Sequence, residues 1–197
     1  MIDNDRIYAL DYEFNKPQLL KLYDDLEGTK VSWPWHLNNP NGQWSKRGYS
    51  VKFLYNIISG RAPRDSVPRF VMDLLDYFAP MGPYLSIGFF HTKPHFTYPV
   101  HTDQGGVLKG QGPQASVNVV LTDDAVPICF TEDIQIEGPP YESGDNDFEY
   151  EYEAALINTS WPHYIKNAKK ERIVFRMAIF PPSDFYQARE GLKSIGH

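Results

Sequence analysis

The segment HYIKNAKKERIVFRMAIF, residues 163–180, indicates most clearly which fold this chain adopts. Its second half, residues 172–180, is apolar on both faces of a strand, whereas a surface strand would alternate apolar and polar residues. Such a strand is buried on both sides. Residues 162–166 predict a shorter strand before it, and the polar stretch 166–172 predicts a solvated turn between the two.

Two arginines interrupt the apolar strand. Arg172 and Arg176 are four residues apart, an even offset, so their side chains share one face. A buried guanidinium needs an anionic partner, because an unpaired charge is costly away from water. The partner is either an acidic residue of the chain or a bound anion.

Further short strands are expected through the second half of the chain, and Gly, Pro and Asp turns separate them. They cover residues 84–91, 115–121, 126–130 and 150–157. Several short strands without an intervening helix favour a sandwich or a barrel-like double sheet. We therefore predict a mainly β fold with flanking helices in a single domain, residues 1–197.

Residues 1–83 look helical and irregular, apart from a short strand at 7–10, and we expect them to pack on one outer face of the sheet. One helix is predicted to begin at Lys16, capped by Asn15, with Pro17 in its first turn.

A second helix is predicted to begin near Ser66, with Pro68 in its first turn, and to end before Pro80. The Trp-rich segment 33–44 is either a lid over a pocket or a loop held to the core by its aromatic side chains. Residues 181–197 are expected to form a C-terminal tail.

The triplet His101-Thr102-Asp103 is the strongest candidate for a metal site. In an extended segment its first and third side chains point to the same side, so both can reach one cation. Two histidines and one carboxylate form the facial triad of non-haem iron(II) oxygenases, which leaves three positions open. Alone, the His-x-Asp pattern is weak, because it occurs often by chance.

His163 strengthens the metal prediction as the third ligand. It begins one predicted strand, and Arg172 begins the next. This arrangement suits a dicarboxylate, because one end can chelate the metal while the far carboxylate meets a guanidinium fork. Arg172 is the preferred anchor, since it stands at the entrance of its strand.

These pieces resemble the iron(II)/2-oxoglutarate-dependent dioxygenases. The resemblance rests on the triplet 101–103, on Asn158-Thr159-Ser160 followed by His163, and on residues 167–174. Within that superfamily they are most similar to the aspartyl/asparaginyl β-hydroxylase-like and prolyl-hydroxylase-like branches. The resemblance covers roughly residues 84–180 and implies a double-stranded β-helix, or cupin-like jelly-roll, core.

The resemblance also implies an enzyme, a hydroxylase of a peptidyl residue or a small molecule. His101, Asp103 and His163 would bind iron and form the catalytic centre. The other site residues would bind the cosubstrate 2-oxoglutarate, with its C5 carboxylate on Arg172: they are Arg172, Arg176 in reserve, Asn118 and Tyr98.

Two features depart from the family pattern. Arg172 follows His163 slightly sooner than the hydroxylase pattern leads one to expect, and residues 104–106 identify no substrate class. A cupin-like jelly-roll that binds metal or a small ligand without oxidising anything would need the triad but not Arg172. A structural β-sandwich with an accidental His-x-Asp would need neither. His91 and His95 have helical metal-ligand spacing, but Pro94 argues against a helix there.

The composition of the chain limits the classes of partner that we expect. The formal charge of −6 argues against nucleic acid, which needs concentrated Lys and Arg. No apolar stretch approaches membrane-spanning length, so no membrane is expected. The single cysteine, Cys129, rules out a disulfide within the chain and fits a reducing compartment, so we expect a cytoplasmic protein.

Overall fold

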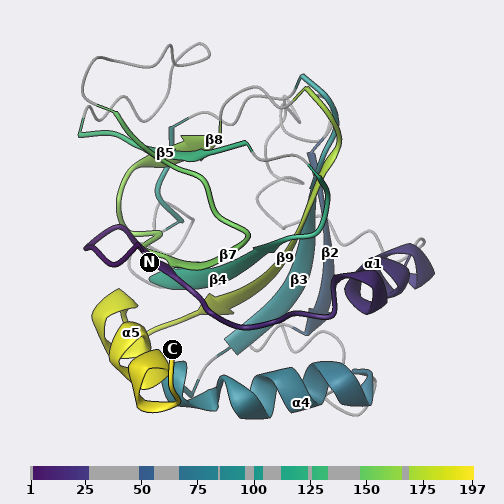
Figure 1. The fold of residues 1–197 in the computed structure, drawn as a ribbon, viewed down its shortest axis with the longest axis horizontal. Helices are drawn as coiled ribbons and strands as arrows, with labels where there is room; N and C mark the ends of the chain where they lie inside the picture. The colour runs from purple at the N-terminus through teal and green to yellow at the C-terminus, as the bar shows by residue number, and fades with distance from the viewer. Residues whose placement is uncertain are drawn as a thin grey trace.

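The computed structural model describes residues 2–26, 49–55, 67–83, 85–95, 100–103, 112–123, 126–132, 147–165 and 169–197. In these ranges, two antiparallel β-sheets face each other, and helices cover the outer side of the larger sheet (Figure 1). This arrangement agrees with the mainly β fold with flanking helices that the sequence predicts.

The larger sheet has six strands in the order β1-β7-β4-β9-β3-β2, all antiparallel to their neighbours. Their bounds are β1 Ile7–Ala9, β2 Tyr49–Tyr55, β3 Leu85–Thr92, β4 Ala115–Val120, β7 Ala154–Ile157 and β9 Arg172–Ile179. The smaller sheet has the order β6-β5-β8, with bounds β5 Ile128–Phe130, β6 Phe148–Tyr150 and β8 His163–Ile165.

Strand β9 lies between β3 and β4, and all eight of its residues are buried. Its outer face carries Ile173, Phe175, Met177 and Ile179, which belong to the core shared with the helices. Its inner face, toward the smaller sheet, therefore carries the alternate residues, Arg172 and Arg176 among them. The predicted burial of this strand on both sides is confirmed.

Among the described residues, three α-helices line the outer side of the larger sheet: α1 Lys16–Asp25, α4 Arg69–Tyr77 and α5 Phe185–Ser194. Asn15 caps α1 as predicted, since its side chain accepts a hydrogen bond from the backbone of Gln18. Helix α4 begins directly after Pro68 and leads into a 3₁₀ helix, η2 Ala79–Met81. Ser66, the predicted cap, lies outside the described residues, as does the segment 33–44.

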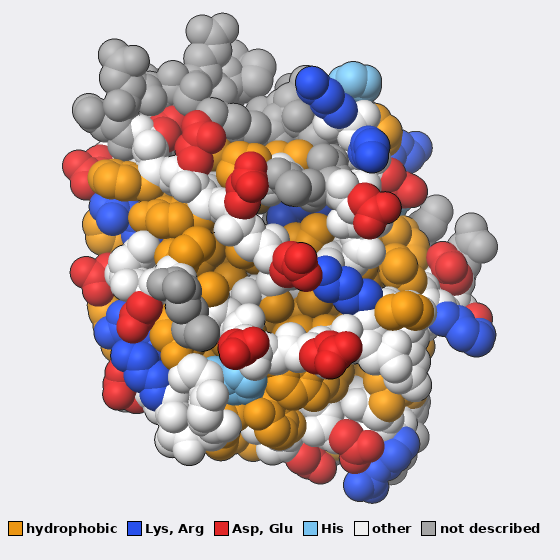
Figure 2. Space-filling view, viewed as in Figure 1, with side chains coloured by type: hydrophobic (Ala, Val, Ile, Leu, Met, Phe, Trp, Pro, Cys, Tyr) orange, Lys and Arg blue, Asp and Glu red, His pale blue; other side chains and the backbone are white. Residues whose placement is uncertain are grey.

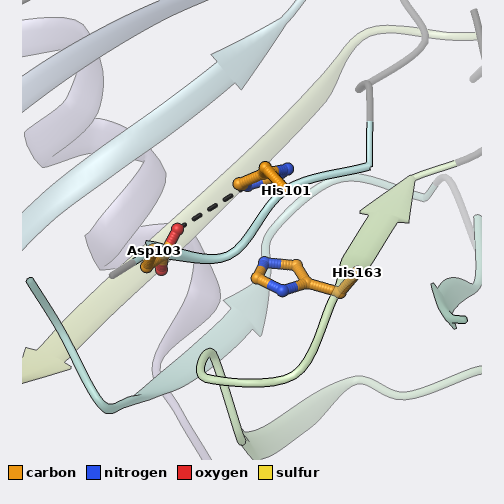
Figure 3. Close-up of side chains that lie close together, drawn as sticks. All are labelled: His101, Asp103 and His163. Atoms are coloured by element: carbon orange, nitrogen blue, oxygen red, sulfur yellow. Dashed lines mark ion pairs between the residues drawn. The ribbon is translucent and has the colours of Figure 1, made fainter. Parts of the chain in front are cut away.

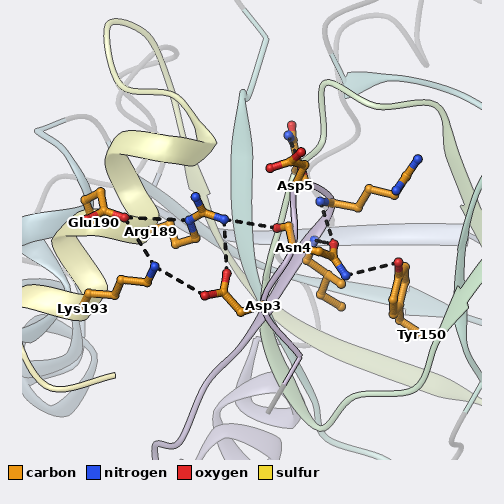
Figure 4. Close-up of polar contacts among 10 residues, drawn as sticks. Asp3, Asn4, Asp5, Tyr150, Arg189, Glu190 and Lys193 are labelled. Carbon is orange, nitrogen blue, oxygen red and sulfur yellow. Dashed lines mark hydrogen bonds and ion pairs between the residues drawn. The ribbon is translucent and has the colours of Figure 1, made fainter.

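The N-terminal segment is tied to the C-terminal helix. Asp3 forms ion pairs with Arg189 and Lys193 of α5, at 3.2 and 3.4 Å (Figure 4). Next to them, Asn4 accepts hydrogen bonds from the backbone of Arg6 and Ile7 and so shapes the turn that leads into β1. The two ends of the described chain thus lie together beside the sheet.

The sequence reading differs from the structure in three elements. Strand β2 comes from the part expected to be helical and irregular, and α5 occupies the expected tail. The predicted strand 150–157 is two strands, because the chain leaves the smaller sheet after Tyr150 and enters the larger one at Ala154. Apolar periodicity indicates that a segment is buried, but it does not indicate to which of the two sheets the segment belongs.

Charged side chains of both signs lie on the surface (Figure 2). On the face shown in Figure 2, the described Lys and Arg side chains are scattered and stand close to Asp and Glu. None of the helices in the described ranges has the length and apolar character needed to cross a bilayer.

Candidate metal centre

Backbone pairing brings the first and third predicted ligands together. His101 forms an antiparallel bridge with His163, the first residue of β8. The bridge has two hydrogen bonds, from His101 N to His163 O at 3.0 Å and from His163 N to His101 O at 2.9 Å. Asp103 is held by a backbone hydrogen bond to the carbonyl of Thr159 at 3.1 Å.

The three side chains converge, as Figure 3 shows: His101 and Asp103 come from one segment, and His163 enters from β8. One potential ligand atom from each side chain lies within 4.8 Å of the others. His101 Nε2 and Asp103 Oδ1 are 3.6 Å apart. Ligands of one cation at about 2.1 Å lie roughly 3 Å apart, so the three ligand atoms would move closer together on coordination.

His163 is neutral at physiological pH. Burial lowers its pKa to about 4, and the neighbouring His101 acts in the same direction. The Nδ1 atom lies 2.8 Å from the carbonyl oxygen of Trp161. A neutral ring therefore donates its Nδ1 hydrogen to that carbonyl, which leaves the Nε2 lone pair available for a metal.

Asp103 is ionised. Its burial alone would raise the carboxyl pKa, but the charge of Arg176 and its hydrogen bond to the carboxylate outweigh burial and hold the pKa below its ordinary value. Arg176 donates a hydrogen bond to Oδ2 of Asp103, and both side chains are nearly buried. The other oxygen, Oδ1, faces His101.

The two arginines of β9 differ in their partners. Arg176 is paired with Asp103, so this arginine has the acidic partner that a structural ion pair requires. Arg172 is 5% exposed and donates to the hydroxyl of Tyr152 at 3.1 Å, but it has no ion pair with any described residue. Its Nε atom, like that of Arg176, is buried without a hydrogen-bond partner among them, so in their capacity for an anion the two arginines differ by the ion pair alone. Of the two, Arg172 is the one with capacity for an anion.

Three other residues considered in the sequence analysis are Asn118, Tyr98 and His91. Asn118 pairs in register with Arg176 across β4 and β9, and its Oδ1 atom is buried without a described partner. Tyr98 lies outside the described residues. His91 pairs with Glu171 at 2.7 Å and its ring lies against Tyr23 of α1, on the outer side of the sheet.

The donor set fits a first-row divalent cation. Two imidazole nitrogens and one carboxylate oxygen suit iron(II), and three ligands leave positions for a chelating cosubstrate. The buried, unpartnered atoms of Arg172 and Asn118, on the inner face of the larger sheet, also fit a site that receives a polar molecule.

Sequence reasoning missed the residues that support the triad. Thr159 donates its hydroxyl hydrogen to the carbonyl of Pro113 at 3.0 Å, and Asn158 donates to the carbonyl of Asp5 at 2.8 Å. Tyr152, the partner of Arg172, was also missed. The Asn-Thr pair before His163 was a visible signal, but its partners are distant in sequence.

Comparison with solved structures shows the fold. The chain is similar to a prolyl hydroxylase from Trichoplax adhaerens, solved with a peptide fragment of a hypoxia-inducible-factor oxygen degradation domain. The match has 14% identity, covers 93% of this chain and 85% of that one, and has a TM-score of 0.54. HygX from Streptomyces hygroscopicus, solved with nickel and 2-oxoglutarate, matches with 12% identity, coverage of 89% and 82%, and a TM-score of 0.50.

No protein-family model matches the sequence, and no curated protein matches it either. The structural likeness therefore concerns the fold. The chain has the jelly-roll, or double-stranded β-helix, fold of the iron(II)/2-oxoglutarate oxygenases, as the resemblance of the sequence predicted.

Proposed function

We propose that this chain is an iron(II)- and 2-oxoglutarate-dependent dioxygenase that hydroxylates a peptidyl residue or a small molecule. The observation that carries the proposal is the convergence of His101, Asp103 and His163 at the inner side of a jelly-roll. When bound, iron(II) with the cosubstrate supplies the oxidising power of such a reaction.

The chain's own residues have separate tasks in this proposal. His101, Asp103 and His163 hold the metal, and the Nδ1 hydrogen bond of His163 sets the orientation of its ring. Arg172 and the hydroxyl of Tyr152 bind the far carboxylate of 2-oxoglutarate. Arg176 remains the partner of Asp103, which makes it the weaker candidate for the anchor, and Asn118 lies beside it on the inner face.

Anaerobic titration tests the proposal. Iron(II) and 2-oxoglutarate together should produce a weak visible charge-transfer absorption that neither produces alone, and air should then give succinate. Asp103→Ala should abolish both signals. The absence of this absorption in the native chain would overturn the proposal, whereas metal binding without it would favour a cupin-like binding protein, which needs the triad but not Arg172.

The anchor has its own test. Arg172→Met should leave metal affinity unchanged and weaken 2-oxoglutarate binding about 10-fold to 100-fold, as expected for a lost charged hydrogen bond. Arg189→Met is the matched control, because Arg189 lies on α5, away from the inner face. Equal affinity for 2-oxoglutarate in Arg172→Met and the native chain would exclude Arg172 as the anchor.

A further inference from the structure

The inner face of the larger sheet carries several buried polar atoms that have no hydrogen-bond partner among the described residues. Beside the atoms already named on Arg172 and Asn118, they are Ser86 Oγ, Ser116 Oγ and Arg176 Nε. Leaving such an atom unpaired destabilises the folded state. A cluster of them on one face therefore indicates space for a polar guest.

Strand register arranges these residues in rows across β3, β9 and β4. Gly88, Arg176 and Asn118 form one row, and the next row consists of Ser86, Ala178 and Ser116. Rows on one face are about 7 Å apart, because they are two residues apart along a strand. The Arg176 row marks the level of Asp103, since the two side chains are paired.

Arg172 lies on one side of this level and Ser86 on the other. Arg172 is four residues, or about 13 Å of strand, from Arg176, in the direction opposite to Ala178. A cosubstrate that chelates the metal and reaches Arg172 therefore extends away from the Ser86 row. The Ser86 end of that row remains for the molecule to be oxidised.

A small cavity lies at this point of the inner face. Its described lining consists of Ser86, Gly88, Phe90, Pro113, Arg176, Ala178 and Phe180. It has room for about one water-sized group, and the small residues Gly88 and Ala178 provide that room. Phe90 also contacts Arg176, whose guanidinium carbon lies 4.7 Å from the centre of its ring.

The polar atoms of this cavity determine what it can bind. Arg176 and Ser86 both line it, and each carries a buried atom, Nε and Oγ, without a described hydrogen-bond partner. Arg176 Nε can only donate a hydrogen bond, and the Ser86 hydroxyl can donate another. The guest is therefore an acceptor. Because Asp103 already balances the charge of Arg176 and the other walls are largely apolar, a neutral acceptor suits the cavity better than a carboxylate.

We propose that the cavity between Ser86 and Arg176 is a substrate subsite that receives a neutral acceptor oxygen, that of a carboxamide or peptide carbonyl. The proposal rests on the dioxygenase function proposed above, which supplies the metal centre beside it. It selects substrates that carry an amide carbonyl near the C–H bond to be oxidised, and it disfavours an ammonium group, which has no acceptor.

Acetamide is a suitable probe, and zinc can replace iron(II) because it has no redox chemistry. The protein is labelled with [¹³C-methyl]alanine, saturated with zinc and 2-oxoglutarate, and titrated with acetamide while the methyl signal of Ala178 is followed by NMR. Acetamide should shift that signal, and methylammonium at the same concentrations should not.

Ser86→Ala should weaken acetamide binding about threefold to tenfold, as expected for one lost neutral hydrogen bond. Ser116→Ala is the matched control, because Ser116 is equally buried and unpartnered but is not among the residues that line the cavity. No shift with acetamide, or equal affinities in Ser86→Ala and Ser116→Ala, would overturn the subsite.

Titration calorimetry with zinc and then 2-oxoglutarate precedes these measurements and separates the two proposals. If both bind and acetamide does not, the dioxygenase proposal stands and the subsite falls. If neither binds, the dioxygenase proposal falls, and any acetamide site that remains is not a substrate subsite, so this inference falls with it.

Discussion

His163 combines two properties that a metal ligand needs: its ring is buried and neutral, and one nitrogen is oriented by a hydrogen bond to the Trp161 carbonyl. Neither property is visible in the sequence, because both depend on what packs around the ring. The position of His163 could nevertheless be predicted, since it begins a strand that precedes the arginine-bearing strand β9.

The low pKa of His163 predicts acid sensitivity of the metal-free protein. The unfolded chain binds a proton at this histidine below about pH 6.5, whereas the folded chain does so only near pH 4. Stability should therefore fall as the pH decreases from about 6.5 to 4, by at most about 3 kcal/mol from this residue. Urea unfolding of the metal-free protein at several pH values measures this loss.

His163→Gln should flatten the profile between pH 6.5 and 4, because glutamine does not titrate. His95→Gln is the control, since His95 is exposed and should leave the slope unchanged. A slope that persists in His163→Gln would show that another group causes the acid sensitivity.

At the scale of elements, the N-terminal segment holds the loop that leads into His163, the third candidate ligand. Asn158, which is 2% exposed, donates from its backbone to Arg6 O and from its side chain to Asp5 O, both at 2.8 Å. The guanidinium of Arg6 also lies over the ring of Trp161, 4.4 Å from its centre. The loop 158–161 is thus clamped immediately before His163.

Asn158→Ala should weaken zinc or manganese(II) binding about tenfold, the effect typical of residues that orient metal ligands. Calorimetric titration measures it. Asn15→Ala controls for general destabilisation, because it removes the cap of α1 and should lower the melting temperature without changing metal affinity. Equal losses of metal affinity in Asn158→Ala and Asn15→Ala would contradict the role of Asn158 in holding the loop 158–161.

Helix α5 packs against η2 at a glycine. A Cβ atom at Gly191 would lie 2.1 Å from the carbonyl oxygen of Pro80, which is backbone and cannot turn away. Gly191→Ala should therefore destabilise the protein by about 1–3 kcal/mol, the usual effect of overpacking. Denaturant unfolding gives the value.

Glu190→Ala, at an exposed position of the same helix, should change stability by less than about 1 kcal/mol. If Gly191→Ala destabilises the protein as little as Glu190→Ala does, α5 can shift to accommodate the added methyl group. The contact with η2 then does not limit the size of residue 191.

At the scale of the whole molecule, the candidate metal centre connects the two sheets. His163 belongs to β8 of the smaller sheet, while Asp103 is paired with Arg176 of the larger one. A bound cation would therefore link the two sheets, and it would stabilise the native state.

Manganese(II) at about a thousand times its dissociation constant should add about 4 kcal/mol of stability. For a chain of this length the melting temperature should rise by roughly 8–16 °C, measured by calorimetry with and without the ion. Asp103→Ala should abolish the rise. An equal rise in Asp103→Ala would place the bound ion elsewhere.

Much of the architecture could be predicted from residue patterns. Strand β9, buried on both faces, indicated two layers, and Asn15 indicated the start of α1. Both features depend on residues that are close together in the sequence. Strand β2 was missed, since Lys52 interrupts its apolar pattern; the structure shows this lysine buried and donating to the carbonyl of Tyr23 at 2.7 Å. Helix α5 was missed although its capping box, Asp184 with Gln187, was visible.

The sequence by itself predicted the candidate ligands, and it determined the face shared by Arg172 and Arg176, because two-residue periodicity fixes which side chains point together. Only the tertiary structure decided their partners: Asp103 forms an ion pair with Arg176, and the hydroxyl of Tyr152 accepts a hydrogen bond from Arg172. Such pairings join residues 73 and 20 positions apart in the chain, and they depend on the register between strands and on loop paths, which local pattern does not encode.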